Sequence, residues 1–368
     1  MSVLKSRPVL RWLVPVTAVA TVIGGGAALG TFAAQAEPSL PPRTAAQLLV
    51  DLQTSRLEGL SGTVVQRADL GLPPLAGLVG GDNLTGLLTG THTLRVWHSG
   101  PDRQRIALLD TLGERDIIRN GRDVWTWDSR TNAATHRTLP EGEGEAAPEV
   151  PATPQDAADR ALAAIDPSTE VSVGRSATVA GRDAYELVLA PRDAASLVHQ
   201  VRIAIDAREH VPLRFEVFAD GSDQPAFEMA FTQVSYARPD ADQFTFNPPP
   251  GVKVTEETLG ERSTRRDRAG DGERPDVRTV GEGWGTVVVA RLDGAGAAGG
   301  PGKAPAAGAG REPAGEAAAL LGALPAVSGD WGSGRLLTGK LFSVLLTDDG
   351  RVIAGAVTPE RLYEVAKG

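Results

Sequence analysis

Histidine and carboxylate side chains are the residues of this chain that could perform acid–base or metal chemistry. The five histidines are far apart and follow no HExxH-like spacing: His92, His98, His136, His199 and His210. Five carboxylates cluster in sequence: Asp110, Glu114, Asp116, Asp123 and Asp128. They flank predicted hairpin turns, where carboxylates are usually solvated, so we expect no catalytic or metal role for them.

Other motifs of enzymes and cofactor sites are missing from the sequence. It contains no cysteine, which excludes disulfides, thiolate metal sites and cysteine nucleophiles. There is no GxSxG elbow and no P-loop, and "DGSD" and "TDDG" have too few ligands for a calcium loop. The net charge of −9 argues against a nucleic-acid partner. We therefore expect a non-enzymatic protein without cofactor or metal.

Residues 1–36 are typical of an export signal. Lys5, Arg7 and Arg11 precede an uncharged apolar run over residues 12–34, and Ala34 and Ala36 fit an A-x-A cleavage site. The run is also long enough to span a membrane, so cleavage after Ala36 and retention as an anchor both stay open. Either alternative places the rest of the chain outside the cytoplasmic membrane.

The elements that follow are mainly strands. A helix is predicted to start near Thr44, with Ala45, Leu48, Leu49 and Leu52 as its apolar stripe. Short segments of period two then alternate with Gly, Asn and Asp turns up to residue 254, which indicates an antiparallel meander. We count about ten strands, with a second helix over residues 154–166.

The predicted fold class is mainly β, of the α+β kind: an incomplete, curled antiparallel β-barrel with a helical or loop lid, plus a small C-terminal α+β module. The half-barrel domain covers residues 40–254, and the prolines at 248–250 end its sheet pairing. Residues 255–278 form a charged linker. The C-terminal module covers residues 279–368, with a Gly/Ala/Pro-rich insertion at 293–315 and a final helix from Thr358-Pro359.

Two features of the predicted half-barrel are apolar without an obvious structural need. Trp125 and Trp127 in "NGRDVWTWDSRTN" share one face of a strand. They either fill an ordinary core or line a ligand cavity. Residues 70–90, "LGLPPLAGLVGGDNLTGLLTG", form either a disordered or self-packed insertion or an apolar lid over the sheet.

The order of several motifs resembles a known superfamily. These motifs are "GLSGTVV", "NGRDVWTWDSRTN", "AGRDAYELVLAP", "VRIAIDAREHVPLRFEVF" and "FTQVSYARPDADQFTFNPPPGVKV". Over residues 40–254 the chain resembles the LolA/RseB-like superfamily of extracytoplasmic lipoprotein- and lipid-binding proteins, which includes the LolA, LppX/LprG and MucB/RseB types. The resemblance implies an open half-barrel whose cavity takes acyl chains. It transfers no polar site residue to this chain.

The resulting functional prediction is an envelope carrier of lipid or lipoprotein. The alternative is an RseB-like sensor that acts through a membrane partner such as an anti-sigma factor, and the C-terminal module favours it somewhat. The candidate ligand cavity comprises Trp125, Trp127, Leu94, Val96, Ile106, Leu108, Ile203, Ile205, Leu213, Phe215, Val217, Phe227 and Phe231. The candidate lid comprises Leu72, Leu75, Leu78, Val79, Leu84, Leu87 and Leu88.

Overall fold

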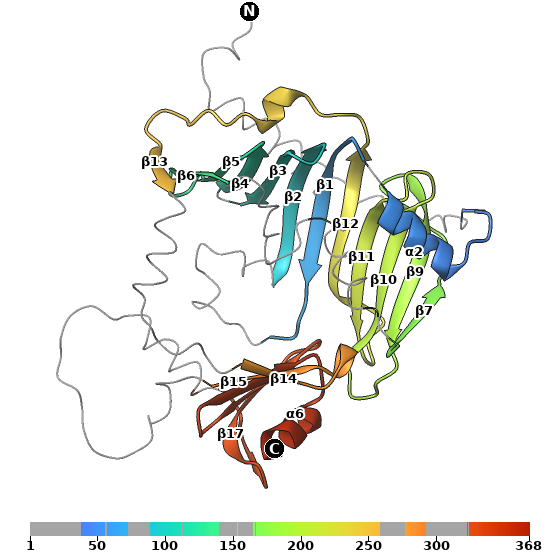
Figure 1. Ribbon diagram of the computed structural model, residues 1–368, viewed down its shortest axis with the longest axis vertical. Helices are drawn as coiled ribbons and strands as arrows, with labels where there is room; N and C mark the ends of the chain where they lie inside the picture. Colours follow the sequence, from blue (N-terminus) through green and yellow to red (C-terminus); the bar gives the residue numbers. More distant parts are fainter. Residues whose placement is uncertain are drawn as a thin grey trace, which may run out of the picture. The chain divides into compact units, whose positions relative to one another are not determined.

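A large curled β-sheet and a smaller C-terminal sheet make up the protein (Figure 1). The computed structural model describes residues 38–55, 57–72, 89–111, 113–139, 167–257, 277–291 and 324–368, together with residues 153, 165 and 322. The predicted export signal, most of the 70–90 loop, the helix at 154–166, most of the linker and the 293–315 insertion lie outside the described residues.

The first element is helix α2, Ala45–Thr54, which begins where the sequence predicts. The Thr44 side chain accepts a hydrogen bond from the backbone N–H of Gln47, and the Gln47 side chain accepts one from the backbone N–H of Thr44. This capping box satisfies two N–H groups that the first turn would otherwise leave unpaired. Leu48 and Leu52 on its apolar stripe are buried.

The large sheet is built from two successive antiparallel meanders. The first comprises β1 (Gly59–Ala68), β2 (Gly90–Ser99), β3 (Arg103–Asp110), β4 (Gly113–Asn120), β5 (Asp123–Asp128) and β6 (Ala133–Thr138). The second comprises β7 (Thr169–Val173), β8 (Ala177–Val179), β9 (Arg182–Pro191), β10 (Val198–Asp206), β11 (Pro212–Ala219) and β12 (Pro225–Ser235). The meanders join because β1 pairs with β12.

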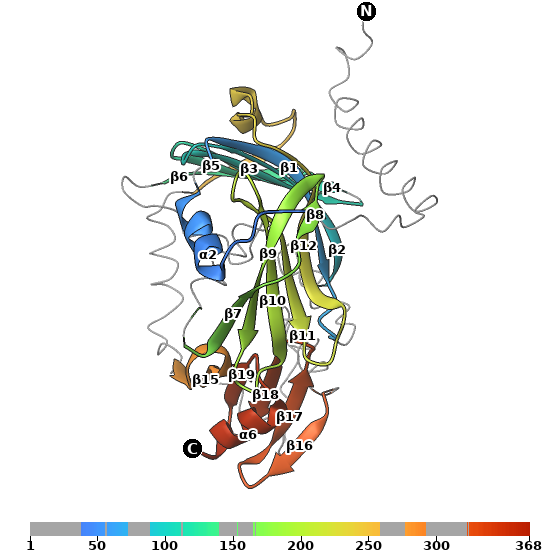
Figure 2. The ribbon, with the colours of Figure 1, turned by 90° about the vertical axis from the view of Figure 1, so that its right-hand side faces the viewer.

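The sheet has the order β13-β6-β5-β4-β3-β2-β1-β12-β11-β10-β9-β7. Strand β8 lies outside this order and pairs with β9, as β7 does. The sheet curves strongly between its two halves without closing into a barrel (Figures 1 and 2). The expected incomplete, curled barrel is therefore confirmed.

Two details of the sheet correct the sequence-based expectation. The prolines at 248–250 do not end the pairing, because β13 (Lys253–Glu257) returns after them and lies parallel to β6. This strand crosses the predicted domain boundary at residue 254. The segment "TEVSVGRSATVA", whose alternating pattern predicts a single strand, is divided into β7 and β8. A Cβ at Gly174 would lie 2.5 Å from the Glu186 carboxylate, so a larger residue at this break would require Glu186 to move.

The C-terminal sheet has six strands in the order β14-β15-β19-β18-β17-β16. They are β14 (Val277–Val280), β15 (Val287–Arg291), β16 (Ala326–Gly329), β17 (Gly332–Thr338), β18 (Ser343–Thr347) and β19 (Arg351–Gly355). Helix α6, Pro359–Lys367, follows Thr358 as predicted. Its Leu362 and Val365 pack with Val289, Leu345 and Ile353 to form a core separate from that of the large sheet.

Hydrogen bonds connect the two sheets. The backbone N–H of Leu197 donates to Ala356 O at 2.9 Å, and that of Thr358 donates to Ala195 O at 2.9 Å. Trp284 Nε1 donates to Thr169 Oγ1 at 2.8 Å. Trp284 and Ala356 also pack against the core under helix α2. The C-terminal module is thus attached to the large sheet at the ends of β7 and β10.

Candidate functional site

The register of the large sheet sorts its side chains onto two faces. Cross-strand partners share a face, and neighbours along one strand alternate between faces. Helix α2 covers one face, and the turn η3 (Ala241–Phe244) covers the other; Figure 2 shows α2 and the gold η3 on opposite sides of the sheet. We call them the α2 face and the η3 face.

The α2 face is largely apolar over β1–β3 and β9–β12, whereas over β4 and β5 it carries Arg115, Thr126 and Asp128. Eleven of the thirteen predicted cavity residues lie on it or in its two cores: Leu94, Val96, Ile106, Leu108, Ile203, Ile205, Leu213, Phe215, Val217, Phe227 and Phe231. Gly62 in "GLSGTVV" provides space for the Phe231 ring, because a Cβ there would lie 2.8 Å from its carbons. Most of the eleven are buried, but Ile106, Leu108, Val217 and Phe227 are only partly buried.

Trp125 and Trp127 lie on the η3 face instead. Trp125 is the cross-strand partner of Ile118, and Ile118 is the partner of Arg105, whereas Ile106 points the opposite way. The Trp125 ring stacks on His136, with ring centroids 4.2 Å apart. Phe246, from the segment after η3, lies 5.1 Å from Trp125 and 6.0 Å from Trp127. The structure therefore separates the tryptophan pair from the other eleven residues.

Hydrogen bonds attach the residues just before the predicted lid to the C-terminal module. Leu72 is described, whereas Leu75, Leu78, Val79, Leu84, Leu87 and Leu88 lie outside the described residues. Just before Leu72, Lys340 of the C-terminal module donates through its backbone N–H to Leu70 O at 2.7 Å and through Nζ to Asp69 at 2.6 Å. The base of the loop is thus attached to the β17–β18 turn.

Charged groups are buried on the η3 face between β3 and β4. Arg105 donates to both carboxylate oxygens of Asp116, at 3.2 and 2.9 Å, and the Asp116 side chain is 1% exposed. Glu114 lies 3.9 Å from the same guanidinium. The Arg105 guanidinium also lies over the Trp97 ring and donates to Gln243 O in η3. The expectation that these carboxylates are solvated is wrong for Asp116, because η3 and its neighbours cover it.

Burial shifts the titration of both carboxyl groups. It raises the pKa of Glu114 to about 7, and the nearby Asp116 charge adds to the rise, while Arg105 opposes it. Burial also raises the pKa of Asp116, although the Arg105 pair acts in the opposite direction. This arrangement is a structural ion cluster with a carboxyl group that titrates near neutral pH.

Replacing Glu114 with glutamine should stabilise the protein at pH 8 and have little effect at pH 5. The pKa of Glu114 in the folded protein is about 7, above its usual value of 4.5. Between these pH values Glu114 is therefore protonated in the folded protein and ionised in the unfolded chain. Stability should therefore fall as pH rises through that window, and the glutamine variant should lose that dependence. Urea denaturation midpoints of both proteins at pH 5 and pH 8 measure this. Equal differences at both pH values would contradict it.

One known family is similar to part of the large sheet. Residues 89–252 match the family model for the MucB/RseB N-terminal domain. The match supports the resemblance to the LolA/RseB-like superfamily that the sequence motifs indicate.

Solved structures with a related arrangement have low sequence identity to this chain. The MucA/MucB complex of Pseudomonas aeruginosa shows 18% identity, covering 88% of this chain and 96% of that chain, with a TM-score of 0.43. A LolA superfamily protein from Nitrosomonas europaea shows 11% identity, covering 56% and 99%, with a TM-score of 0.22. A putative outer membrane lipoprotein-sorting protein domain from Vibrio parahaemolyticus shows 10% identity, covering 55% and 97%, with a TM-score of 0.24. No curated protein sequence matches the chain.

In this LolA/RseB-like domain the polar residues of "IDAREHVPLRF" stabilise a turn. The Asp206 carboxylate accepts hydrogen bonds from the backbone N–H groups of Arg208 and Glu209. It also accepts hydrogen bonds from Arg182 Nε at 2.6 Å and from the Tyr236 hydroxyl at 2.8 Å. Burial raises the pKa of Asp206, but these donors outweigh it and the net shift is downward. The motif therefore fixes the β10–β11 connection.

Within the described ranges, no three His, Asp or Glu side chains are grouped closely enough to hold a metal ion. Nor does any helix of the described part combine the length and apolarity that crossing a membrane requires.

Proposed function

We propose that the α2 face holds the acyl chains of a lipid or lipoprotein and that the protein is an envelope carrier of such ligands. The observation that supports this most directly is that four apolar side chains of the α2 face are only partly buried: Ile106, Leu108, Val217 and Phe227. Apolar surface that the described residues leave partly open favours an apolar ligand. Residues 1–36 would then export the chain or anchor it outside the cytoplasmic membrane.

The wall of the proposed site can be tested with two matched variants. Val217→Asn places an amide on the α2 face, whereas Val188→Asn makes the same change at a partly buried position on the η3 face of β9. Burying an amide without a hydrogen bond costs about 1–3 kcal/mol. We therefore expect Val217→Asn to weaken uptake of a fluorescent fatty acid about fivefold or more. Val188→Asn should leave uptake near the wild-type level.

Two results would contradict the carrier proposal. One is equal uptake by the two variants at a temperature where circular dichroism shows both to be folded. The other is the absence of acyl lipid when the purified full chain is extracted with organic solvent and examined by mass spectrometry. Recovery of about one lipid per protein would support carriage.

A sensor role is the second candidate, and the attachment of the C-terminal module favours it. Lys340 of this module donates hydrogen bonds to Asp69 and to Leu70 O, directly after β1 and before the predicted lid. In the solved complex named above, MucB is bound to MucA. By analogy, this chain would bind the extracytoplasmic part of a membrane regulator such as an anti-sigma factor. Calorimetry with such a purified segment tests this: saturable binding supports the role, and no heat change at high concentration argues against it.

A further inference from the structure

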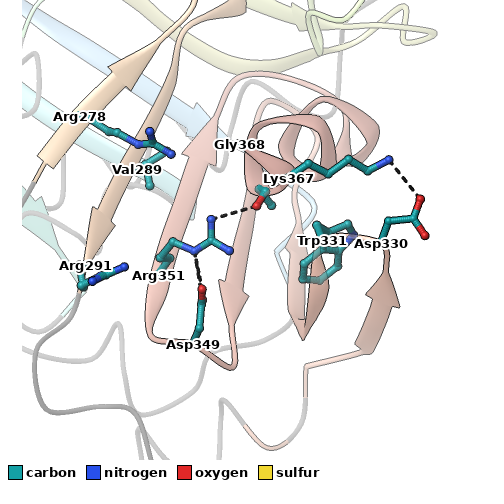
Figure 3. Close-up of a pocket in the computed structure, with 10 residues that line it drawn as sticks. Arg278, Val289, Arg291, Asp330, Trp331, Asp349, Arg351, Lys367 and Gly368 are labelled. Atoms are coloured by element: carbon teal, nitrogen blue, oxygen red, sulfur yellow. Dashed lines mark hydrogen bonds and ion pairs between the residues drawn. The ribbon is translucent and has the colours of Figure 1, made fainter.

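The C-terminal sheet contains a pocket that the proposed acyl site does not use. Its volume is about 540 Å³, and it lies between β14, β15, β19 and the end of helix α6 (Figure 3). Arginine is the most frequent side chain in its lining, with Arg278, Arg291 and Arg351. Each of the three comes from a different strand.

The sheet register brings the three arginines onto one face. Arg278 is the cross-strand partner of Val289, which lies two positions before Arg291 on β15. Arg291 is directly opposite Arg351 on β19. Like charges at directly opposite positions destabilise a sheet. The register thus places the Arg291 and Arg351 charges next to each other at the pocket.

The described carboxylates do not neutralise all of these charges. Arg351 donates to Asp349 at 2.8 Å and to Ala366 O at 3.0 Å. Lys367 lies 3.6 Å from Asp330. Among the described residues, no hydrogen bond or ion pair joins Arg278 or Arg291 to another group, and both are exposed. Two arginine charges at the pocket are therefore available to a ligand.

Arginine pairs and the pocket's size fit a phosphate group. Guanidinium forks match the oxygens of phosphate and carboxylate and bind them through paired hydrogen bonds. Two free positive charges suit a phosphate monoester of about −1.5 to −2 better than a single carboxylate. Pockets of about 300–1,000 Å³ hold small ligands. On one wall Trp331, stacked on Tyr363 with centroids 5.3 Å apart, adds an aromatic surface.

We propose that this pocket binds a phosphate monoester group through Arg278 and Arg291, with Arg351 completing the positive wall. The group is carried either by a soluble phosphate ester or by a lipid headgroup. The site is separate from the α2 face and does not depend on the acyl-binding proposal.

The test uses the full chain with two double variants. Arg278→Gln/Arg291→Gln removes the two free charges at the pocket. Arg130→Gln/Arg192→Gln removes the same charge from half-exposed or exposed arginines of the large sheet. The probes are inorganic phosphate, measured by calorimetry at low salt, and phosphatidylcholine vesicles with and without phosphatidate, measured by sedimentation.

The expected result is binding that depends on the pocket arginines. The pocket variant should bind at least one probe about tenfold to a hundredfold more weakly than the wild type, because hydrogen bonds between charged groups are lost. The control variant should match the wild type. Binding of inorganic phosphate without phosphatidate-dependent sedimentation identifies a soluble ester, and phosphatidate-dependent sedimentation identifies a headgroup.

Two outcomes would overturn the proposal: no binding of either probe by the wild type, or equal loss in the pocket and control variants. Thermal unfolding of both variants excludes a folding defect as the cause. Arg278→Lys/Arg291→Lys keeps the charge but not the fork geometry, so it should bind more weakly than the wild type and more strongly than the glutamine variant. If the lysine variant bound the probes no more strongly than the glutamine variant, that result would also contradict the proposed site.

Discussion

Replacing Arg105 with alanine should lower the free energy of unfolding by about 3–5 kcal/mol, the cost typical of breaking a buried ion pair. Arg105 donates hydrogen bonds to both carboxylate oxygens of Asp116, whose side chain is 1% exposed. Without Arg105, Asp116 must either stay charged in a buried place or take up a proton. Because protonation is easier at low pH, the loss should be larger at pH 8 than at pH 5. Urea or thermal denaturation at both pH values measures it.

Two controls separate this effect from a general loss of arginine. Arg130 lies 4.0 Å from Asp110, and both side chains are about half exposed, so Arg130→Ala should cost at most about 1 kcal/mol. Asp116→Ala in the Arg105→Ala background should recover part of the stability, because it removes the buried unpaired carboxylate. If Arg105→Ala were no more costly than Arg130→Ala, the cluster would not contribute to folding.

The strands were predictable from the sequence because their alternation is regular. Turn residues bound the segments "DRQRIALLD", "ERDIIRN" and "DVWTWD", which the pattern predicts as strands and which form β3, β4 and β5. Helices α2 and α6 began at the predicted Thr44 and Thr358 caps. Turn residues and caps act over a few positions, so local sequence is enough to determine them.

The choice of face was harder to predict, because it depends on register across several strands. Apolar side chains occupy both faces of β3–β5: Ile106 is on the α2 face, and Ile118 and Trp125 are on the η3 face. A shift of one residue in any hairpin reverses this assignment. One signal was available: the two-residue turn Gly121–Arg122 pairs Asn120 with Asp123 and thereby places Trp125 opposite Ile118.

Contacts between residues that are distant in sequence account for the remaining differences between the expected and the observed structure. Asp116 is buried because η3, more than a hundred positions later, covers β3 and β4. In the same way, the parallel pairing of β13 with β6 brings together segments whose local patterns do not predict each other. The polar cluster on the η3 face therefore could not be inferred from spacing alone.

The tryptophan pair gives the second large expected effect. Trp125→Ala/Trp127→Ala should lower the free energy of unfolding by about 3 kcal/mol or more, because each substitution removes a large ring from contacts with Phe246 or His136. Both rings are partly exposed, which keeps the loss below the sum expected for two fully buried tryptophans. Thermal denaturation measures the loss.

The same variant should keep its acyl binding. Trp125 and Trp127 lie on the η3 face, so their removal leaves the partly buried side chains of the α2 face in place. At a temperature where the double variant is folded, fatty-acid uptake should equal that of the wild type, whereas Val217→Asn should show the deficit. A folded tryptophan variant with the same deficit as Val217→Asn would mean that acyl chains reach the η3 face. The η3 face beside Phe246, rather than the α2 face, would then be the ligand site.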